Sequence, residues 1–104
     1  MKLQRFEILL RLNYNDGRPI ERKKFLLMHR ELLDKFGATT VDSIQALGTW
    51  KYRGILYRDR LIRVRIDSAD PEDARAFFQA YKEVLKERFE QLDIWITAHD
   101  IELI

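Results

Sequence analysis

Residues 48–67 constrain the fold most, because apolar and charged side chains alternate regularly in their second half. The alternation divides the side chains into two sets, Ile62, Val64 and Ile66 in one and Leu61, Arg63 and Arg65 in the other. A period of two is that of a β-strand with one face on a core and the other open. We therefore predict a central β-hairpin that bends at Gly48 or at the Arg53-Gly54 step.

Two other segments alternate in the same way. Residues 6–12 place Phe6, Ile8, Leu10 and Leu12 on one face and Glu7, Leu9 and Arg11, together with the preceding Arg5, on the other. Residues 92–97 place Leu92, Ile94 and Ile96 inward, and the apolar positions then change parity at Ile101 and Leu103. This change predicts a bulge or break after Ala98, followed by a continuation of the strand or a short fifth strand. Residues 41–46 are predicted to form the strand that leads into the hairpin.

Two segments have the period of an α-helix. In residues 20–36 the apolar stripe includes Phe25, Met28, His29, Leu32, Leu33 and Phe36. Pro19 is expected in the first turn of this helix and Gly37 at its C-terminal cap. The second helix is predicted to begin at Asp70-Pro71, where the carboxylate can cap it. Its apolar stripe is Ala74, Phe77, Phe78, Tyr81, Leu85 and Phe89.

The predicted order of elements is therefore β-α-β-β-α-β in a single domain of residues 1–104. Two right-handed crossovers joined by a hairpin predict an α+β, ferredoxin-like two-layer sandwich with antiparallel sheet order 4-1-3-2. Both helices then cover the same face of the sheet. The predicted core is Phe6, Ile8, Leu10, Phe25, Met28, Leu32, Phe36, Ile62, Val64, Ile66, Phe77, Phe78, Tyr81, Leu85, Ile94 and Ile96.

Composition narrows the class of protein. The chain has no cysteine, which excludes disulfides and thiolate chemistry. Its 46% hydrophobic content argues against disorder, and no apolar run approaches the length of a membrane span. The N-terminal residues are charged and lack the apolar region of a signal peptide, so we expect a cytoplasmic protein with no membrane association.

The charges are divided unevenly along the chain. Residues 1–66 contain 15 Lys and Arg against 7 Asp and Glu, whereas residues 67–104 contain 4 against 10. The two parts can neutralise each other within the fold or between subunits. Alternatively, the first part can bind an anionic partner.

Because the helices cover only one face, the predicted sheet has an open face with several arginines and a tryptophan. We predict an interface or anion-binding surface there, made of Arg5, Leu9, Arg11, Arg63, Arg65 and Trp95. The first hypothesis is that this face forms a homo-oligomer or binds another protein. The alternative is RNA or DNA binding, with arginines on the backbone and aromatic rings stacked on bases.

An enzyme or small-molecule site is a third hypothesis, but no motif specifies one and we assign no catalytic residue, metal or cofactor. His99, Asp100 and Glu102 could hold a divalent ion only if a fourth ligand converged on them. A polar turn explains these three residues more simply. His29 is expected to pack beside the apolar stripe of the first helix. Capping likewise explains Asp70 and Asp73 without an ion.

One pattern resembles a known group of domains. Gly48-x-Trp50, Gly54, Tyr57-Arg58-Asp59 and a helix from Tyr81 to Phe89 followed by Gln91 resemble small bacterial ferredoxin-like domains of unknown function. The resemblance covers roughly residues 6–97. It implies the βαββαβ fold and no activity. Independently of this resemblance, Trp50 is expected to be buried at the end of the sheet.

Overall fold

The computed structural model describes residues 1–38 and 40–104, and the side chains among them except those of residues 40–50, 52 and 57–59. Six elements follow one another along the chain: β1 (Lys2–Arg11), α1 (Arg22–Phe36), β2 (Thr40–Tyr52), β3 (Ile55–Ser68), α2 (Pro71–Arg88) and β4 (Trp95–Glu102). This is the predicted βαββαβ order.

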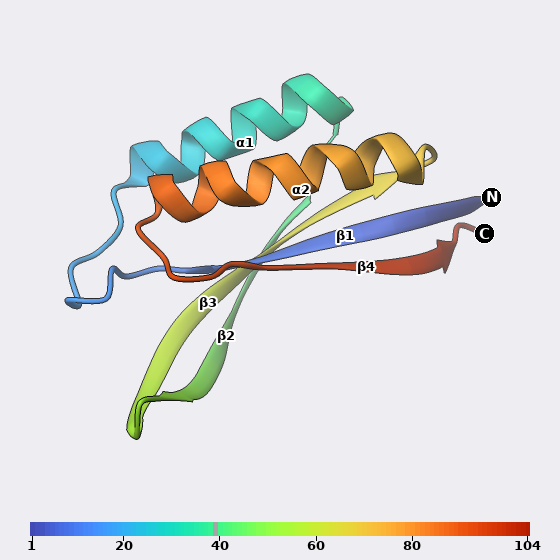
Figure 1. Cartoon of the computed structure of the whole chain (residues 1–104). Coiled ribbons are helices and arrows are strands. Elements are labelled where there is room, and N and C mark those ends of the chain that lie inside the picture. Colours follow the sequence, from blue (N-terminus) through green and yellow to red (C-terminus); the bar gives the residue numbers. More distant parts are fainter. Residues whose placement is uncertain (39) are drawn as a thin grey trace.

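The four strands form one antiparallel sheet in the order β2-β3-β1-β4, which is the predicted order 4-1-3-2 read from the other edge. Figure 1 shows both helices on the same side of this sheet, with the opposite side uncovered. The predicted α+β ferredoxin-like sandwich is thereby confirmed.

The core lies between the sheet and the two helices. Every residue of the predicted core is buried or packed against the buried cluster. At its centre the ring of Phe78 stacks on Phe6 and on Phe36, with ring centroids 4.8 and 5.4 Å apart. Tyr14 and Ile20, in the loop before α1, are also buried and were not predicted. Their burial shows that this loop folds over the end of the core.

Sequence signals at the helix ends are confirmed at two positions and wrong at one. The Asp70 carboxylate accepts a hydrogen bond from the backbone N–H of Asp73, 3.2 Å away, and so caps α2. Gly37 adopts a φ of 77° and donates its N–H to the carbonyl of Leu33. Pro19 does not begin α1. It lies opposite Asn13 in an isolated β-bridge, and α1 begins at Arg22.

The predicted break near the C-terminus is wrong. β4 pairs with β1 without a register shift, from Trp95 opposite Leu9 to Glu102 opposite Lys2. Ile101 therefore belongs to β4 and not to a fifth strand. The parity of the apolar residues changes because Asp100 takes a position on the helix side and hydrogen-bonds to Gln4. A polar residue is tolerated there because its side chain is exposed.

Two residues predicted to face inward do not. Leu33 is 43% exposed, because Met28 and Leu32 form the buried line of α1 and Leu33 falls to one side of it. Leu92 is 64% exposed and precedes β4, so the alternation of a strand does not apply to it. His29 is also exposed on α1 and is not part of the packing.

The β2–β3 hairpin extends beyond the rest of the sheet. β1 pairs with β3 only as far as Leu61, whereas β2 continues to pair with β3 up to the turn. This turn is the predicted Arg53-Gly54 step, where both residues have positive φ. Figure 1 shows the hairpin as an arm that projects away from the helices. The prediction for Trp50 concerns a side chain outside the described ones.

A polar cluster joins the two helices on their facing sides. The Glu31 carboxylate of α1 accepts two hydrogen bonds from the Arg88 guanidinium of α2 and one from the Tyr81 hydroxyl. Burial and the bond to Glu31 together raise the pKa of Tyr81, so its hydroxyl remains a donor. The cluster therefore fixes how α1 lies against α2 above the sheet.

Candidate interface on the open sheet face

Strand register defines which side chains share the open face. Pairing of β1 with both neighbours aligns three rows of residues that point away from the helices. The rows are Leu3, Arg5, Glu7, Leu9 and Arg11 on β1, Leu61, Arg63, Arg65 and Asp67 on β3, and Trp95, Thr97, His99 and Ile101 on β4. The six residues predicted for this surface are among them, and we call this set the open sheet face.

Arg5 is paired within the molecule. Its guanidinium Nε and a terminal nitrogen donate to the two carboxylate oxygens of Asp67, at 2.8 and 3.1 Å. The bond from Arg5 holds the pKa of Asp67 below its ordinary value. Asp67 lies directly across from Arg5 in the ladder, a partner that the sequence analysis missed.

Glu7 lies at the centre of the face between several polar groups. Its carboxylate oxygen is 3.8 Å from the Arg63 guanidinium and 3.6 Å from His99 Nε2. His99 Nε2 is also 3.2 Å from the hydroxyl of Thr97, within hydrogen-bond distance. Only 19% of the Glu7 side chain is exposed, so these neighbours largely enclose it. Much of the positive charge predicted for this face is therefore balanced on the face itself.

The other two arginines of the face, Arg11 and Arg65, have different surroundings. A guanidinium nitrogen of Arg11 donates to Gln91, 3.0 Å away, and to Asn15, so this side chain anchors neighbouring loops. Arg65 is half-buried opposite Glu7 in the ladder, and its Nε has no hydrogen-bond partner among the described residues. A buried guanidinium N–H without an acceptor is costly. An acceptor supplied from outside the chain would remove this cost.

Apolar side chains lie at both ends of the face. Trp95 is 66% exposed and lies beside half-buried Leu9, its partner in the ladder. At the other end, Leu3 pairs with Ile101, and both are half-buried. The polar residues lie between these two apolar pairs. The open sheet face thus combines a large exposed aromatic anchor with four arginines and two carboxylates, which pair with Arg5 and Arg63.

The residues weighed as metal ligands do not converge. His99 lies on the open sheet face, whereas Asp100 lies on the helix side, because successive residues of a strand point to opposite faces. Asp70 caps α2, and Asp73 forms an ion pair with Lys35 at 2.9 Å. Among the described residues no cluster of three His, Asp or Glu side chains suited to a metal ion is found.

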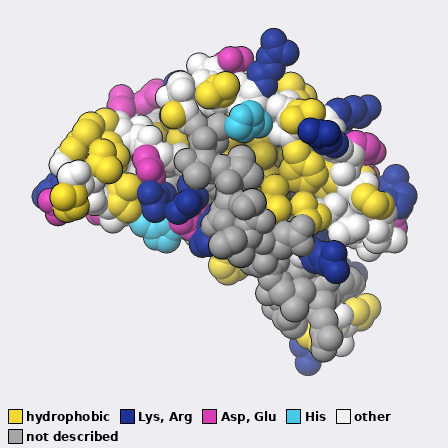
Figure 2. Space-filling view, turned by 180° about the vertical axis from the view of Figure 1, so that it is seen from behind, with side chains coloured by type: hydrophobic (Ala, Val, Ile, Leu, Met, Phe, Trp, Pro, Cys, Tyr) yellow, Lys and Arg dark blue, Asp and Glu magenta, His cyan; other side chains and the backbone are white. Residues whose placement is uncertain are grey.

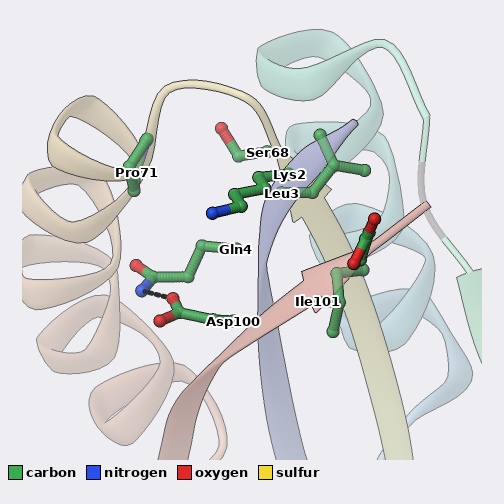
Figure 3. A pocket seen from close by; sticks show the side chains of 8 residues that line it. Lys2, Leu3, Gln4, Ser68, Pro71, Asp100 and Ile101 are labelled. Atoms are coloured by element: carbon green, nitrogen blue, oxygen red, sulfur yellow. Dashed lines mark hydrogen bonds between the residues drawn. The ribbon is translucent and has the colours of Figure 1, made fainter.

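A cleft of about 430 Å³ lies beside the first turn of α2, and Figure 3 shows side chains that line it from β1, β4 and the end of β3. Its wall includes Gln4, Ser68 and Asp100. Gln4 donates to Asp100 at 3.0 Å and accepts from Arg75, while Ser68 bonds to the backbone of residue 70. These groups already satisfy one another. Two charged side chains, Lys2 and Glu102, complete the lining of the cleft.

Neither helix of the described chain is long and apolar enough to cross a membrane. No family model matches the sequence, and no curated protein matches it.

Solved structures resemble the fold. A phage SAM lyase in complex with S-methyl-5'-thioadenosine superposes with a TM-score of 0.70 and 16% sequence identity, over 97% of this chain and 90% of that one. The divalent cation tolerance protein Cut A1 from Thermus thermophilus gives a TM-score of 0.62 and 11% identity, over 100% of this chain and 87% of that one. These likenesses place the chain in the ferredoxin-like class of α+β sandwiches. At such identities they show the fold alone.

Proposed function

We propose that this protein is a self-assembling module whose subunits associate through the open sheet face. The observation that carries the proposal is the 66% exposure of Trp95 on a face whose charged groups largely pair with one another. Interfaces are enriched in tryptophan and arginine, and charged groups there cost less when they are already paired. A second copy of the chain offers the same surface.

The arrangement of this face suits a two-fold axis. Apolar pairs lie at both ends of the β1–β4 ladder, Leu9 with Trp95 and Leu3 with Ile101, with polar residues between them. A two-fold axis that lies in the interface and crosses the strands at the middle of the face would set the Trp95 end of one copy on the Leu3 end of the other. The polar middle would then meet its own copy, where Arg65 of one subunit can find an acceptor.

The test is the association constant of Trp95→Ala measured by sedimentation velocity over a range of concentrations. The matched control is Leu92→Ala, because Leu92 is exposed to nearly the same extent, 64%, but lies outside the open sheet face. We expect Trp95→Ala to weaken association by about a hundredfold and Leu92→Ala to leave it unchanged. Wild-type protein that remains monomeric, or equal effects of the two variants, would refute the proposal.

Nucleic-acid binding is the alternative, and the unpartnered Nε of Arg65 supports it. Arg65→Ala should then weaken binding of a single-stranded oligonucleotide, and the affinity should fall steeply with salt. The ion pair of Arg5 with Asp67 and the position of Glu7 weaken this alternative, since they place negative charge where phosphates would lie. An ultraviolet spectrum of the purified oligomer, recorded at 260 and 280 nm, shows whether it carries nucleic acid. This result separates self-assembly from nucleic-acid binding.

A small-molecule function is a third candidate, favoured by the likeness to the phage SAM lyase complex over 97% of this chain. In this candidate the exposed ring of Trp95 stacks on an adenine, and Glu7 and Thr97 supply polar contacts. Calorimetric titration with S-methyl-5'-thioadenosine tests it directly. Binding that is lost in Trp95→Ala supports this candidate, and absence of binding at millimolar ligand, of the order of the weakest specific affinities, rejects it.

A further inference from the structure

Two rows of side chains cross the middle of the open sheet face, and on β1 and β3 their charges are reversed with respect to each other. The ladders place in one row Asp67, Arg5 and His99, and in the next row Arg65, Glu7 and Thr97. In Figure 2 this side of the sheet is seen along its edge at the lower left, where side chains of both charges and a histidine lie next to one another. The middle of the face therefore has a defined pattern of charge.

The guanidinium of Arg65 lacks an acceptor in this pattern. Arg65 is half-buried and donates no hydrogen bond among the described residues. By contrast, Arg5 donates two hydrogen bonds to Asp67. Asp67 and Glu7 keep acceptor capacity, since a carboxylate can accept about four hydrogen bonds. Each copy thus carries a donor without an acceptor and two carboxylates that can accept further bonds.

We infer that the partner subunit supplies the acceptor for Arg65 and that this acceptor is Asp67. The inference rests on the proposed assembly through the open sheet face and specifies its symmetry. A two-fold axis that crosses the strands between the two rows lays β1 on β1 and β3 on β3 of the other copy, with the rows exchanged. Arg65 then meets Asp67 of the partner subunit, and Arg5 meets the partner subunit's Glu7. Each contact occurs twice.

The same axis matches the apolar ends of the face. Leu9 and Trp95 form the next row on one side of the charged rows, and Leu3 and Ile101 form the next row on the other side. Exchange of the rows therefore sets Trp95 on Ile101 and Leu9 on Leu3 of the other copy. One arrangement thus pairs the charges in the middle and covers the exposed tryptophan at the end.

Shifting this axis along the strands by one residue brings like charges together. An axis on the row of Glu7 sets Glu7 on Glu7 and Arg65 on Arg65 of the other copy. An axis on the row of Arg5 does the same to Arg5 and Asp67. Like charges that face each other across an interface oppose association. The alternation of charge between the rows therefore selects the position of the axis.

An axis parallel to the strands does not satisfy both the charged rows and the apolar ends. Placed on β1, it sets Arg5 on Arg5 and Glu7 on Glu7. Placed between β1 and β3, it pairs opposite charges but lays β4, with Trp95, on β2 of the other copy. Placed between β1 and β4, it leaves β3, with Arg65, beyond the edge of the other sheet.

The first test is cross-linking through single cysteines with a short bis-maleimide, in a chain that has no cysteine of its own. The variants are Leu3→Cys and Leu9→Cys. The inferred axis sets position 3 of one copy on position 9 of the other, whereas identical positions lie about 20 Å apart along the strand. We therefore expect a covalent dimer from a mixture of the two variants and none from either alone. Leu92→Cys, 64% exposed and outside the face, is the control and should give no covalent dimer with Leu9→Cys.

The second test is a double-mutant cycle on the charged pair, with association constants measured by sedimentation velocity. The variants are Arg65→Gln, Asp67→Asn and the double variant. We expect each single variant to weaken association by about tenfold or more, and the double variant to be no weaker than the singles, because all three lose the same contact. The control Lys2→Gln removes a positive charge outside the two rows and should have no effect.

The outcomes separate this inference from the proposal on which it rests. If the wild-type protein stays monomeric, both fail. If it assembles in a manner that depends on Trp95, but Leu9→Cys alone forms a covalent dimer, assembly through the open sheet face stands and the axis across the strands is overturned. A mixture that gives no covalent dimer, or additive effects in the cycle, overturns the inference as well. The two tests alter different positions, so a variant that fails to fold in one leaves the other decisive.

Discussion

Replacement of Glu31 by alanine should destabilise the fold more than the loss of an ordinary surface charge. Glu31 accepts hydrogen bonds from both the Arg88 guanidinium and the Tyr81 hydroxyl. Arg88 retains 16% of its side-chain exposure, and Tyr81 is 6% exposed. Without Glu31 both donors lose this carboxylate acceptor, and water can reach them only in part.

The magnitude follows from the number and burial of these bonds. A hydrogen bond to a charged group contributes roughly 1.5–3 kcal/mol when buried, and far less when solvent screens it. Because the Glu31 side chain is 35% exposed, we discount the three bonds to a total of about 2 kcal/mol. For a chain of this length that loss lowers the melting temperature by roughly 10 °C.

The assay is urea unfolding followed by circular dichroism, at a protein concentration where the oligomeric state is fixed. Lys82→Ala is the control, because it removes an ion pair with Asp93 at 3.0 Å that lies nearer the surface. We expect this control to cost less than about 1 kcal/mol. If Glu31→Ala costs no more than Lys82→Ala, the reasoning that partial burial strengthens the interhelical cluster is refuted.

The contribution of Glu31 to stability depends on pH. The bond from Arg88 holds the pKa of Glu31 below its ordinary value in the folded protein. A carboxylate with a lowered folded pKa stabilises the fold above its unfolded pKa, and this contribution is lost as the pH falls through the folded value. The difference between wild type and Glu31→Gln should therefore shrink in acid. A difference that stays constant down to acid pH would contradict it.

Two further predictions test the open sheet face and the segment before β4. Arg5 lowers the pKa of Asp67, so Asp67→Asn should cost up to about 1 kcal/mol in urea unfolding at neutral pH and nothing in acid, and an equal cost at both pH values would count against the pair. Ile94→Ala should cost about 2–4 kcal/mol because Ile94 is 2% exposed, whereas Leu92→Ala should stay within about 0.5 kcal/mol; similar costs would mean that Leu92 is buried after all.

The fold could be predicted because its local and periodic signals agree. The alternation around Val64, the Asp70 cap and the Gly37 cap each select a local structure, and all three are compatible with one topology. Sequence periodicity does not fix how far a helix is rotated about its axis. Leu33 was therefore assigned to the buried stripe although the rotation of α1 leaves it exposed. The strand break predicted before Ile101 is wrong for a related reason. The alternation of apolar residues does not show where the helices stop covering the sheet.

The composition of the open sheet face could be predicted, but the pairing of its charges could not. Alternation alone placed Arg5, Arg63, Arg65 and Trp95 on one face. The partner of Arg5 depends on register, because a shift of one residue between β1 and β3 would replace Asp67 by a residue of the other face. Register is set by the whole sheet. The sequence therefore predicted a face more basic than the one that the structure shows.

The uneven distribution of charge along the chain is resolved only in part by folding. Arg5 with Asp67 and Lys35 with Asp73 join the basic and acidic parts of the sequence within one molecule. On the open sheet face four arginines still stand against two carboxylates, and the Nε of Arg65 has no acceptor among the described residues. The charge that folding leaves unbalanced there therefore favours a partner that supplies an acceptor.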